Sequence, residues 1–238
     1  MNDYNHITSA IEQLRYKKHA KEVCKLIPKN GKILDMGCGM GHFDLMLREE
    51  RSDIDITGID LREWSNWWDK YCEAGIEFVV GDALHTSFKD GEFDVVVSSG
   101  LFEHVDAAEF FREVWRLLKP GGYNIILNVP SKYGLGENLS YMLGVAKHGT
   151  GMEKRYTKKM LKGIISSNSF DVVSLHQEGF VPAQFGVFGK GVESFMNKFA
   201  KPLIKIDGVL SFLPLSQSFI AITRRRNLCE NVNIKMLN

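Results

Sequence analysis

Hydrophobic and polar residues alternate along the first half of the chain with two different periods. Between Ile7 and Ile27, apolar side chains recur three or four positions apart with charged residues between them, which predicts an amphipathic helix. The short apolar run KILDM follows, then the glycine-rich stretch GCGMG and a second helical pattern. This order predicts a strand, a tight loop and a helix in direct succession.

The same rhythm continues to Pro130. The runs DITGID, IEFVVGD, FDVVVSS and YNIILNVP predict four further strands. Helices are predicted over residues 63–72 and 106–118, the second ended by the Lys-Pro-Gly-Gly stretch at 119–122. Strands that alternate with helices through short connections form parallel sheets with helices on both faces. The fold class predicted is therefore a doubly wound, Rossmann-like α/β domain.

Beyond Pro130 the rhythm changes. A glycine-rich irregular stretch is followed by a predicted helix over 157–167, and FDVVSLHQ and QSFIAITRRR predict two last strands with a long Phe-rich insertion between them. We expect residues 1–238 to form one domain. Within it, 1–30 would be an N-terminal helical cap, 131–155 and 180–216 would be insertions at the site that binds the acceptor substrate, and 227–238 would be a tail.

Composition and charge exclude several classes of protein. With 44% hydrophobic and 25% charged residues, the chain resembles ordinary globular proteins and not disordered ones. A formal net charge of +1 gives no overall positive field for a nucleic acid. The four cysteines lack zinc-site spacing, so we predict no metal and expect reduced thiols. The N-terminus lacks a signal-peptide pattern and no run of 18 apolar residues occurs, so we expect a cytoplasmic protein without a transmembrane segment.

The glycine loop and two acids indicate an adenosine-containing ligand. A dinucleotide fingerprint needs G-x-G-x-x-G, but His42 occupies the third glycine position, which disfavours a nicotinamide-dependent oxidoreductase. Asp60 and Asp82 end the next two strands, where carboxylates can accept hydrogen bonds from ribose hydroxyls and an adenine amino group. Either acid alone is equally typical of a turn or a helix cap. Their succession after a glycine loop favours the ligand.

These stretches resemble a known family. ILDMGCGMG resembles the first motif of class I S-adenosylmethionine-dependent methyltransferases, of the small-molecule, type 11-like branch. ITGIDL, VVGDALHTSFKDGEFDVVVSSGLFEHV and RLLKPGG resemble the motifs that follow it in the family, and the resemblance covers residues 31–130. It implies a seven-stranded sheet with an antiparallel last strand, S-adenosylmethionine as cofactor, and methyl transfer.

The resemblance also implies which residues bind the cofactor. They follow the carboxyl ends of successive predicted strands. The residues expected around the methionine part are Asp35, Gly37, Cys38, Gly39 and Gly41. Those expected at the ribose and adenine are Asp60, Leu61, Asp82 and Ala83, and those expected near the sulfonium and its methyl group are Ser98 and Ser99.

The methyl acceptor is not identified by these motifs. Candidates for acceptor contacts or proton transfer are His148, Arg155 and Tyr156, in or just after the irregular stretch where such enzymes place acceptor contacts. The alternatives are a solvated loop histidine for His148 and a surface ion pair for Arg155. His104 is expected to order the loop after the fourth strand, and Tyr16 belongs to the N-terminal segment that often closes over the cofactor in this family.

The insertion at 180–216 is the most individual part of the sequence. Its apolar helical stripe with lysines beside it predicts a peripheral membrane contact through 190–206, a cap on an apolar acceptor site, a dimer contact or simple core packing. Phe185, Phe188 and Phe195 would then supply apolar wall.

Four functions remain as alternatives. The leading one is methyl transfer to an O, N or C atom of a small molecule, with lipid and glycan precursors as candidates. RNA or protein methylation is second, and it is disfavoured for nucleic acids because VSSG replaces the N/D-P-P-aromatic motif and no basic domain is appended. A cofactor-binding partner protein without catalysis is third, and the oxidoreductase is last. A monomer and a homodimer both stay open.

Overall fold

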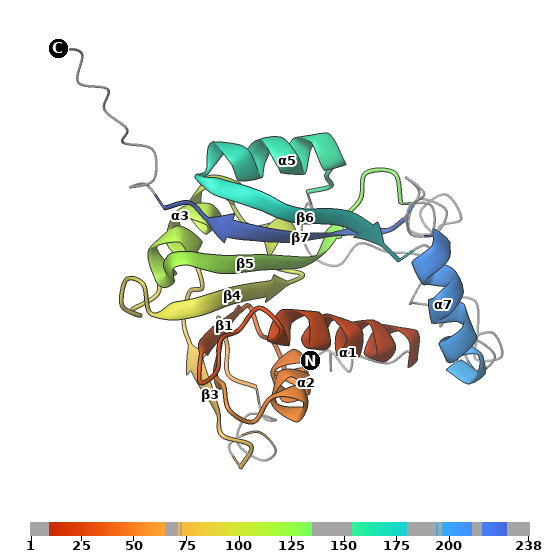
Figure 1. Cartoon of the computed structure of the whole chain (residues 1–238), viewed down its shortest axis with the longest axis horizontal. Coiled ribbons are helices and arrows are strands. Elements are labelled where there is room, and N and C mark those ends of the chain that lie inside the picture. Colours follow the sequence, from red (N-terminus) through yellow and green to blue (C-terminus); the bar gives the residue numbers. More distant parts are fainter. Residues whose placement is uncertain are drawn as a thin grey trace.

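A seven-stranded sheet forms the centre of the computed structural model, with strands in the order β3-β2-β1-β4-β5-β7-β6 (Figure 1). The structure describes residues 10–64, 71, 73–134, 154–179, 194, 197–210 and 216–227. The strands are β1 (Lys32–Met36), β2 (Asp55–Asp60), β3 (Ile76–Val80), β4 (Phe93–Ser99), β5 (Leu118–Pro130), β6 (Phe170–Glu178) and β7 (Ser218–Arg225). The helices are α1 (Ala10–Cys24), α2 (His42–Glu50), the 3-10 helix η2 (Phe102–His104), α3 (Ala107–Leu117), α5 (Lys158–Ser167) and α7 (Ala200–Leu210).

The pairing of the strands confirms the predicted fold class. The first five strands run parallel, whereas β7 lies antiparallel between β5 and β6. β1 pairs with β2 on one side and with β4 on the other, so the strand order reverses at β1. In open parallel sheets, this reversal opens a crevice at the carboxyl ends of the two strands, where ligands bind.

Two hydrophobic clusters cover the two faces of the sheet. Ile33 of β1 packs in the cluster that contains Val23 of α1 and Leu47 of α2. The next residue, Leu34, packs in the other cluster with Phe110 of α3. Successive side chains of a strand point to opposite faces, so a strand covered on both faces reads as the continuous apolar run seen in the sequence.

The helix α3 and the strand β5 meet without a loop, which differs from the prediction. The Asp106 carboxylate caps α3 by accepting from two N–H groups of its first turn at 3.0 Å. The helix ends at Leu117, and β5 begins at Leu118, so the Lys-Pro-Gly-Gly stretch belongs to the strand. Leu118 pairs with Phe93 of β4, and a shift of register before Val95 absorbs the irregular residues.

Two other predicted helices have different outcomes. The helix predicted over 157–167 is confirmed as α5, capped by the Thr157 hydroxyl, which accepts from the Met160 N–H at 3.2 Å. The Trp-rich helix predicted over 63–72 falls mostly outside the described residues, and Glu63 and Trp64 themselves are not helical. No helix in the described ranges is long and apolar enough to cross a membrane.

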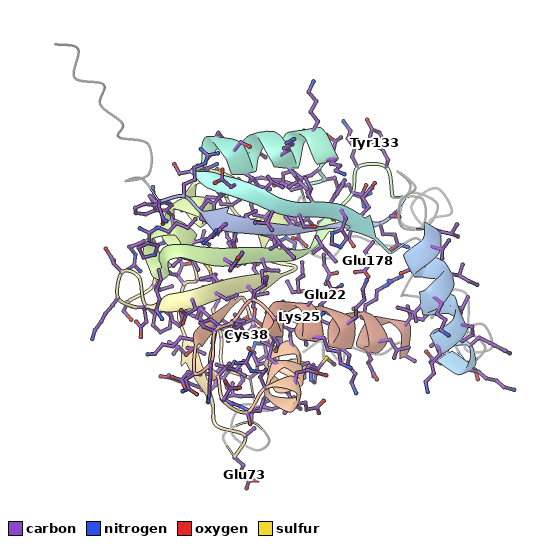
Figure 2. The ribbon with its side chains drawn as sticks, in the orientation of Figure 1. Glu22, Lys25, Cys38, Glu73, Tyr133 and Glu178 are labelled. Carbon is purple, nitrogen blue, oxygen red and sulfur yellow. The ribbon has the colours of Figure 1, made fainter. Side chains whose placement is uncertain are left out.

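Buried charges fasten α1 to the far edge of the sheet and to α7. Glu178, at the end of β6, accepts from Lys18 Nζ at 2.8 Å and pairs with His19 Nε2 (Figure 2). One turn earlier, Arg15 donates to Asp207 Oδ2 of α7 through Nε at 3.1 Å and through a terminal nitrogen at 2.9 Å. Burial disfavours the ionised form of Glu178, but His19 and Lys18 outweigh burial and hold its pKa at about 2.

We predict that Glu178→Gln destabilises the fold in a pH-dependent way. The pKa of Glu178 lies below its ordinary value of 4.5, so its contribution is fully present above that pH and is lost as the pH falls toward about 2. Removing one partner of a buried ion pair should cost roughly 2–4 kcal/mol near neutral pH. Urea unfolding at a series of pH values measures the difference.

The exposed Glu73, changed to Gln, is the matched control and should leave the free energy of unfolding unchanged (Figure 2). A difference between the wild type and Glu178→Gln that stayed constant down to strongly acidic pH would contradict the assigned role of the ion pair.

Candidate active site

The glycine loop GCGMG folds back onto the end of β2. The N–H groups of Gly37 and Cys38 donate to the carbonyl oxygen of Ile59 at 2.8 and 3.1 Å. The Gly39 N–H donates to Asp60 Oδ2 at 2.9 Å. Because β1 and β2 run parallel, the loop and this carboxylate leave the sheet at the same edge. The hydrogen bond from Gly39 therefore joins two features that the sequence placed 21 residues apart.

Two glycines of this loop serve different purposes. Gly41, at the N-terminus of α2, has a φ of 76°, and a Cβ there would lie 2.7 Å from the Phe78 ring. Only glycine fits this position. Gly39 has a φ of 53°, but a Cβ there would meet no atom within 4 Å, so the loop backbone faces open space. No side chain caps the first turn of α2, which leaves the positive end of the helix dipole beside the loop.

A cavity of about 510 Å3 lies beside the loop. This volume is within the range of roughly 300–1,000 Å3 that small-molecule sites occupy. Its walls come from α1, from the loop after β1 and from the segments that follow β2 and β4. The lining residues are Glu12, Tyr16, Asp35, Gly37, Cys38, Gly39, Met40, His42, Phe43, Arg62, Trp64, Ser99, Gly100 and His104.

Two buried acids lie close to the cavity, and no ion pair joins either of them to a cationic side chain in the described part of the chain. Asp35 is 2% exposed, and its Oδ1 has no hydrogen-bond partner within the described part of the chain. Burial, and then the charges of Asp44 and Asp60, raise the pKa of Asp35 well above its ordinary value. Burial likewise raises the pKa of Asp44 to about 7. A ligand with a positive charge would relieve this arrangement, because it would compensate the ionised form of Asp35.

A second buried polar group faces the same cavity. Trp64 Nε1 is buried and makes no hydrogen bond with any described residue. The guanidinium of Arg62 lies 3.9 Å from the centre of the Trp64 ring, so the two side chains stack at the cavity wall. A buried indole N–H is costly to leave unpaired, and a ligand that offers an acceptor would pair it.

Cys38 has a packing role in this loop (Figure 2). A Cβ on Gly58 of β2 would lie 2.8 Å from its sulfur, so the thiol rests directly on the bare strand backbone. Burial, helped by the charges of Asp44 and Asp35, raises the pKa of the thiol. The thiol therefore stays protonated and is a poor nucleophile.

Three polar side chains meet at the carboxyl ends of β4 and β5. Asn128 Nδ2 donates to the Tyr16 hydroxyl at 3.1 Å and to Ser99 Oγ at 3.0 Å, and the two hydroxyls lie 3.0 Å apart. The bond between the hydroxyls uses one of their two protons. The other proton has no acceptor in this cluster and is available to a ligand in the cavity.

Asn128 reaches this position through an unusual backbone. Its φ is 59°, in the left-handed region, where asparagine is tolerated better than most residues. The register between β5 and β7 shifts at this point, between Ile126 and Val129. The local irregularity turns the Asn128 amide toward Tyr16 and Ser99.

The structure brings some of the predicted cofactor residues together at the cavity. Those that line it are Asp35, Gly37, Cys38, Gly39 and Ser99.

The other predicted cofactor residues are not among those that line the cavity. Gly41 shapes the loop, and Asp60 holds it. Leu61 is 76% exposed, whereas Ser98 is fully buried and its hydroxyl has no partner among the described residues. Ala83 is buried.

Asp82, in this second group, forms a turn. It accepts from the Leu84 N–H at 2.9 Å, and its other oxygen lies 3.0 Å from His85 Nδ1.

The three candidate catalytic residues stay predictions. Tyr156 is 4% exposed and packs on Phe102 with 5.3 Å between ring centroids, and Arg155 is half-buried; neither lines the cavity. His148 lies outside the described residues, as do most of 131–155 and 180–216 with the phenylalanines expected in the second insertion.

Sequence reasoning undervalued the contribution of α1. Glu12 and Tyr16, four residues apart on one helical face, both line the cavity, and so does His104 of η2. The detectable signal was a pair of polar side chains four positions apart on one face of this helix. Among the described residues, no group of three or more His, Cys, Asp or Glu side chains is arranged to hold a metal ion.

The alignments of curated proteins with this chain cover half of it or less. Demethylmenaquinone methyltransferase from Listeria monocytogenes serotype 4a is 33% identical over 128 residues, which are 50% of this chain and 54% of that protein. Fatty-acid O-methyltransferase from Mycolicibacterium smegmatis is 34% identical over 114 residues, 44% of this chain and 40% of that protein. The chain thus spans about half the length, or less, of these relatives.

Solved structures match nearly the whole chain at lower identity. Geranyl diphosphate C-methyltransferase from Streptomyces coelicolor A3(2), in complex with Mg2+, geranyl diphosphate and S-adenosyl-L-homocysteine, has a TM-score of 0.60 at 15% identity and covers 90% of this chain and 79% of that one. The [4+2]-cyclase SpnF has a TM-score of 0.63 at 17% identity and covers 94% and 84%. These likenesses show the fold.

The sequence model of one family, described as a methyltransferase domain, matches residues 34–126. This range runs from β1 into β5 and includes the glycine loop, Asp35 and Asp60. Residues 34–126 of this chain are therefore similar to a methyltransferase domain.

Proposed function

We propose that the protein transfers the methyl group of S-adenosylmethionine to a small molecule, and that the acceptor is an amphiphile of the lipid-precursor class. The observation that carries the proposal is the cavity at the β1–β4 reversal point. It joins an uncompensated buried acid, Asp35, an open glycine backbone at Gly39, and a hydroxyl donor of the Tyr16–Ser99 pair.

The cavity residues fit S-adenosylmethionine. Asp35 suits the cationic amino acid end of the cofactor, and the uncapped first turn of α2 suits its carboxylate. Asp60, already held against the loop by Gly39, suits the ribose hydroxyls. Trp64 offers an unpaired N–H and a flat ring beside them. When bound, the cofactor supplies an electrophilic methyl group on a positively charged sulfur.

The chain's own residues would position the acceptor and exclude water. The available hydroxyl proton of Tyr16 or Ser99 orients an oxygen atom of the acceptor. Burial raises the pKa of Tyr16, so this hydroxyl stays a donor near neutral pH. His104, which lines the same cavity and whose side chain is 44% exposed, is the residue placed to take a proton from a hydroxyl acceptor.

Two observations support an amphiphilic acceptor. Phe43, Met40 and Trp64 give the cavity an apolar lining between its polar groups. The names of three similar proteins also refer to demethylmenaquinone, fatty acid and geranyl diphosphate. The proposal keeps 131–155 and 180–216 as acceptor-site segments, with His148, Arg155 and Tyr156 as candidate polar contacts.

The alternative is a cofactor-binding protein that transfers no methyl group. A [4+2]-cyclase has the same fold, so the fold alone does not select methyl transfer. Conversion of S-adenosylmethionine to S-adenosylhomocysteine in the presence of quinol, prenyl and fatty-acid acceptors separates the two functions.

We predict that S-adenosylmethionine binding releases a proton from Asp35. The pKa of this carboxyl is raised above 3.8 in the free protein, and a bound cation favours its ionised form. Affinity should therefore increase as pH rises through the raised pKa. Calorimetric titrations in buffers of different ionisation enthalpy, over about pH 5–8, count the proton.

Asp35→Asn should abolish the proton release and weaken binding by roughly 1.5–3 kcal/mol, the value of a hydrogen bond to a charged group. Asp55→Asn, at the exposed start of β2, is the matched control. An undiminished proton release in Asp35→Asn would show that another group is responsible.

We predict that Asp60→Ala weakens S-adenosylmethionine binding by about 1–3 kcal/mol, because the ribose hydroxyls and the Gly39 N–H lose their shared acceptor. Asp82→Ala tests the adenine end in the same titration. Normal binding by Asp60→Ala would exclude Asp60 as the ribose ligand.

We predict that Tyr16→Phe lowers turnover by about 10- to 100-fold, while the dissociation constant for S-adenosylmethionine changes little, because the lost hydroxyl orients the acceptor. Tyr123→Phe, in β5, is the control. His104→Gln should lower turnover in the same selective way for a hydroxyl acceptor. Parallel losses of turnover and cofactor affinity in Tyr16→Phe would assign Tyr16 to the cofactor instead.

A further inference from the structure

Helix α7 and the residues just before it carry two adjacent stripes on their outer side. Phe199, Ile206 and Val209 are 40%, 49% and 69% exposed, and together with the exposed Pro202 they form an apolar stripe with helical spacing of three and four. Beside it runs a basic stripe with the same spacing, made by the exposed residues Lys198, Lys201 and Lys205. We refer to these seven residues as the α7 face.

The α7 face contains no acid because the only acid of the helix points inward. Asp207 is 1% exposed and accepts two hydrogen bonds from Arg15 of α1. The inner side of the helix also buries Ala200, which packs on Ile11 of α1. Within the described ranges, no carboxylate pairs with the three lysines of the face. No described carboxylate therefore compensates these charges.

A groove between α1 and α7 continues the face. Its volume is about 510 Å3, and its floor contains small or apolar residues such as Leu14 and Ala200. Lys17 of α1 lines it together with Lys198 and Lys201, and none of the described lining residues is acidic. Three lysines around a groove suit a phosphate group, and the exposed apolar stripe beside it suits acyl chains.

We propose that the α7 face and this groove form a docking surface for an anionic lipid bilayer. The lysines bind lipid phosphates, and the apolar stripe enters the boundary between headgroups and acyl chains. The charge pattern selects this partner, because apolar residues flanked by lysines without any acid match an anionic interface. Docking on a bilayer is separate from methyl transfer, so it can be tested by vesicle binding without measuring enzymatic turnover.

The surface lies at the functional end of the molecule. In Figure 1, the β6 arrow points toward α7. The parallel strands, whose carboxyl ends lie at the cavity, run in the same direction as β6. Helix α1 borders both places, since Tyr16 lines the cavity and Lys17, its neighbour in sequence, lines the groove. A protein docked through the α7 face therefore presents the cavity end of its sheet toward the bilayer.

Vesicle sedimentation with the full chain tests the proposal. The wild type should bind phosphatidylcholine vesicles that contain about 30% phosphatidylglycerol and should not bind pure phosphatidylcholine, and about 0.5 M salt should release it. The combined Lys198→Gln, Lys201→Gln and Lys205→Gln variant should lose on the order of 100-fold in affinity, at about fivefold per lysine.

The helix α5 supplies matched controls. Its exposed Lys158, Lys159 and Lys162, changed together to Gln, remove the same charge from another part of the surface and should leave vesicle binding intact. Ile206→Gln with Val209→Gln should weaken binding by about tenfold or more through lost apolar burial. Met160→Gln, a 46% exposed position on α5, should have no effect.

Three results would overturn the proposal. They are the absence of binding to anionic vesicles, an equal loss in the α5 lysine variant, and self-association of the chain that Ile206→Gln abolishes while vesicles remain unbound. The last result would identify the α7 face as a contact between two copies. Unchanged thermal unfolding and S-adenosylmethionine affinity in the α7 variants show that a loss of binding does not come from a loss of fold or from failure of the cofactor site.

Discussion

The rest of the site depends on the charged pairs that hold α1 in place. Helix α1 packs on α2, but its charged side chains reach partners much further along the chain: Lys18 and His19 contact Glu178, and Arg15 contacts Asp207. These partners lie more than 150 residues further along the chain. Because Glu178 and the Arg15–Asp207 pair are buried, losing a partner of either would leave a charge in a poorly solvated place. The position of α1 is thus set by electrostatics as well as by packing.

That position determines the shape of the cavity. Tyr16 directly follows Arg15 and lies three residues before His19, so fixing those residues also fixes its hydroxyl at the ends of β4 and β5. Asp35 and the glycine loop form the opposite part of the lining, and the parallel strands deliver them without help from α1. The sheet therefore supplies one part of the site, and helix α1 supplies the other. The contacts with Glu178, in the edge strand β6, keep α1 in position.

This division explains what the sequence could and could not predict. Strand runs, the glycine loop and Asp60 are local patterns, and their order along the chain translates directly into one edge of a parallel sheet. Tyr16 reads as one more half-buried residue of an amphipathic helix, because its partners Ser99 and Asn128 are distant in sequence. The start of β5 at Leu118 was missed for a related reason: pairing with Phe93 overrides the local preference of Pro and Gly for a turn.

The contact between Cys38 and β2 has an evolutionary consequence. A Cβ at Gly58 would lie 2.8 Å both from the Cys38 sulfur and from the Phe78 ring. Positions 38, 58 and 78 therefore share one fixed volume, and a larger residue at any of them requires a smaller one at another. Homologous chains that keep this loop should show these three positions changing together, with glycine at 58 persisting wherever the other two stay large.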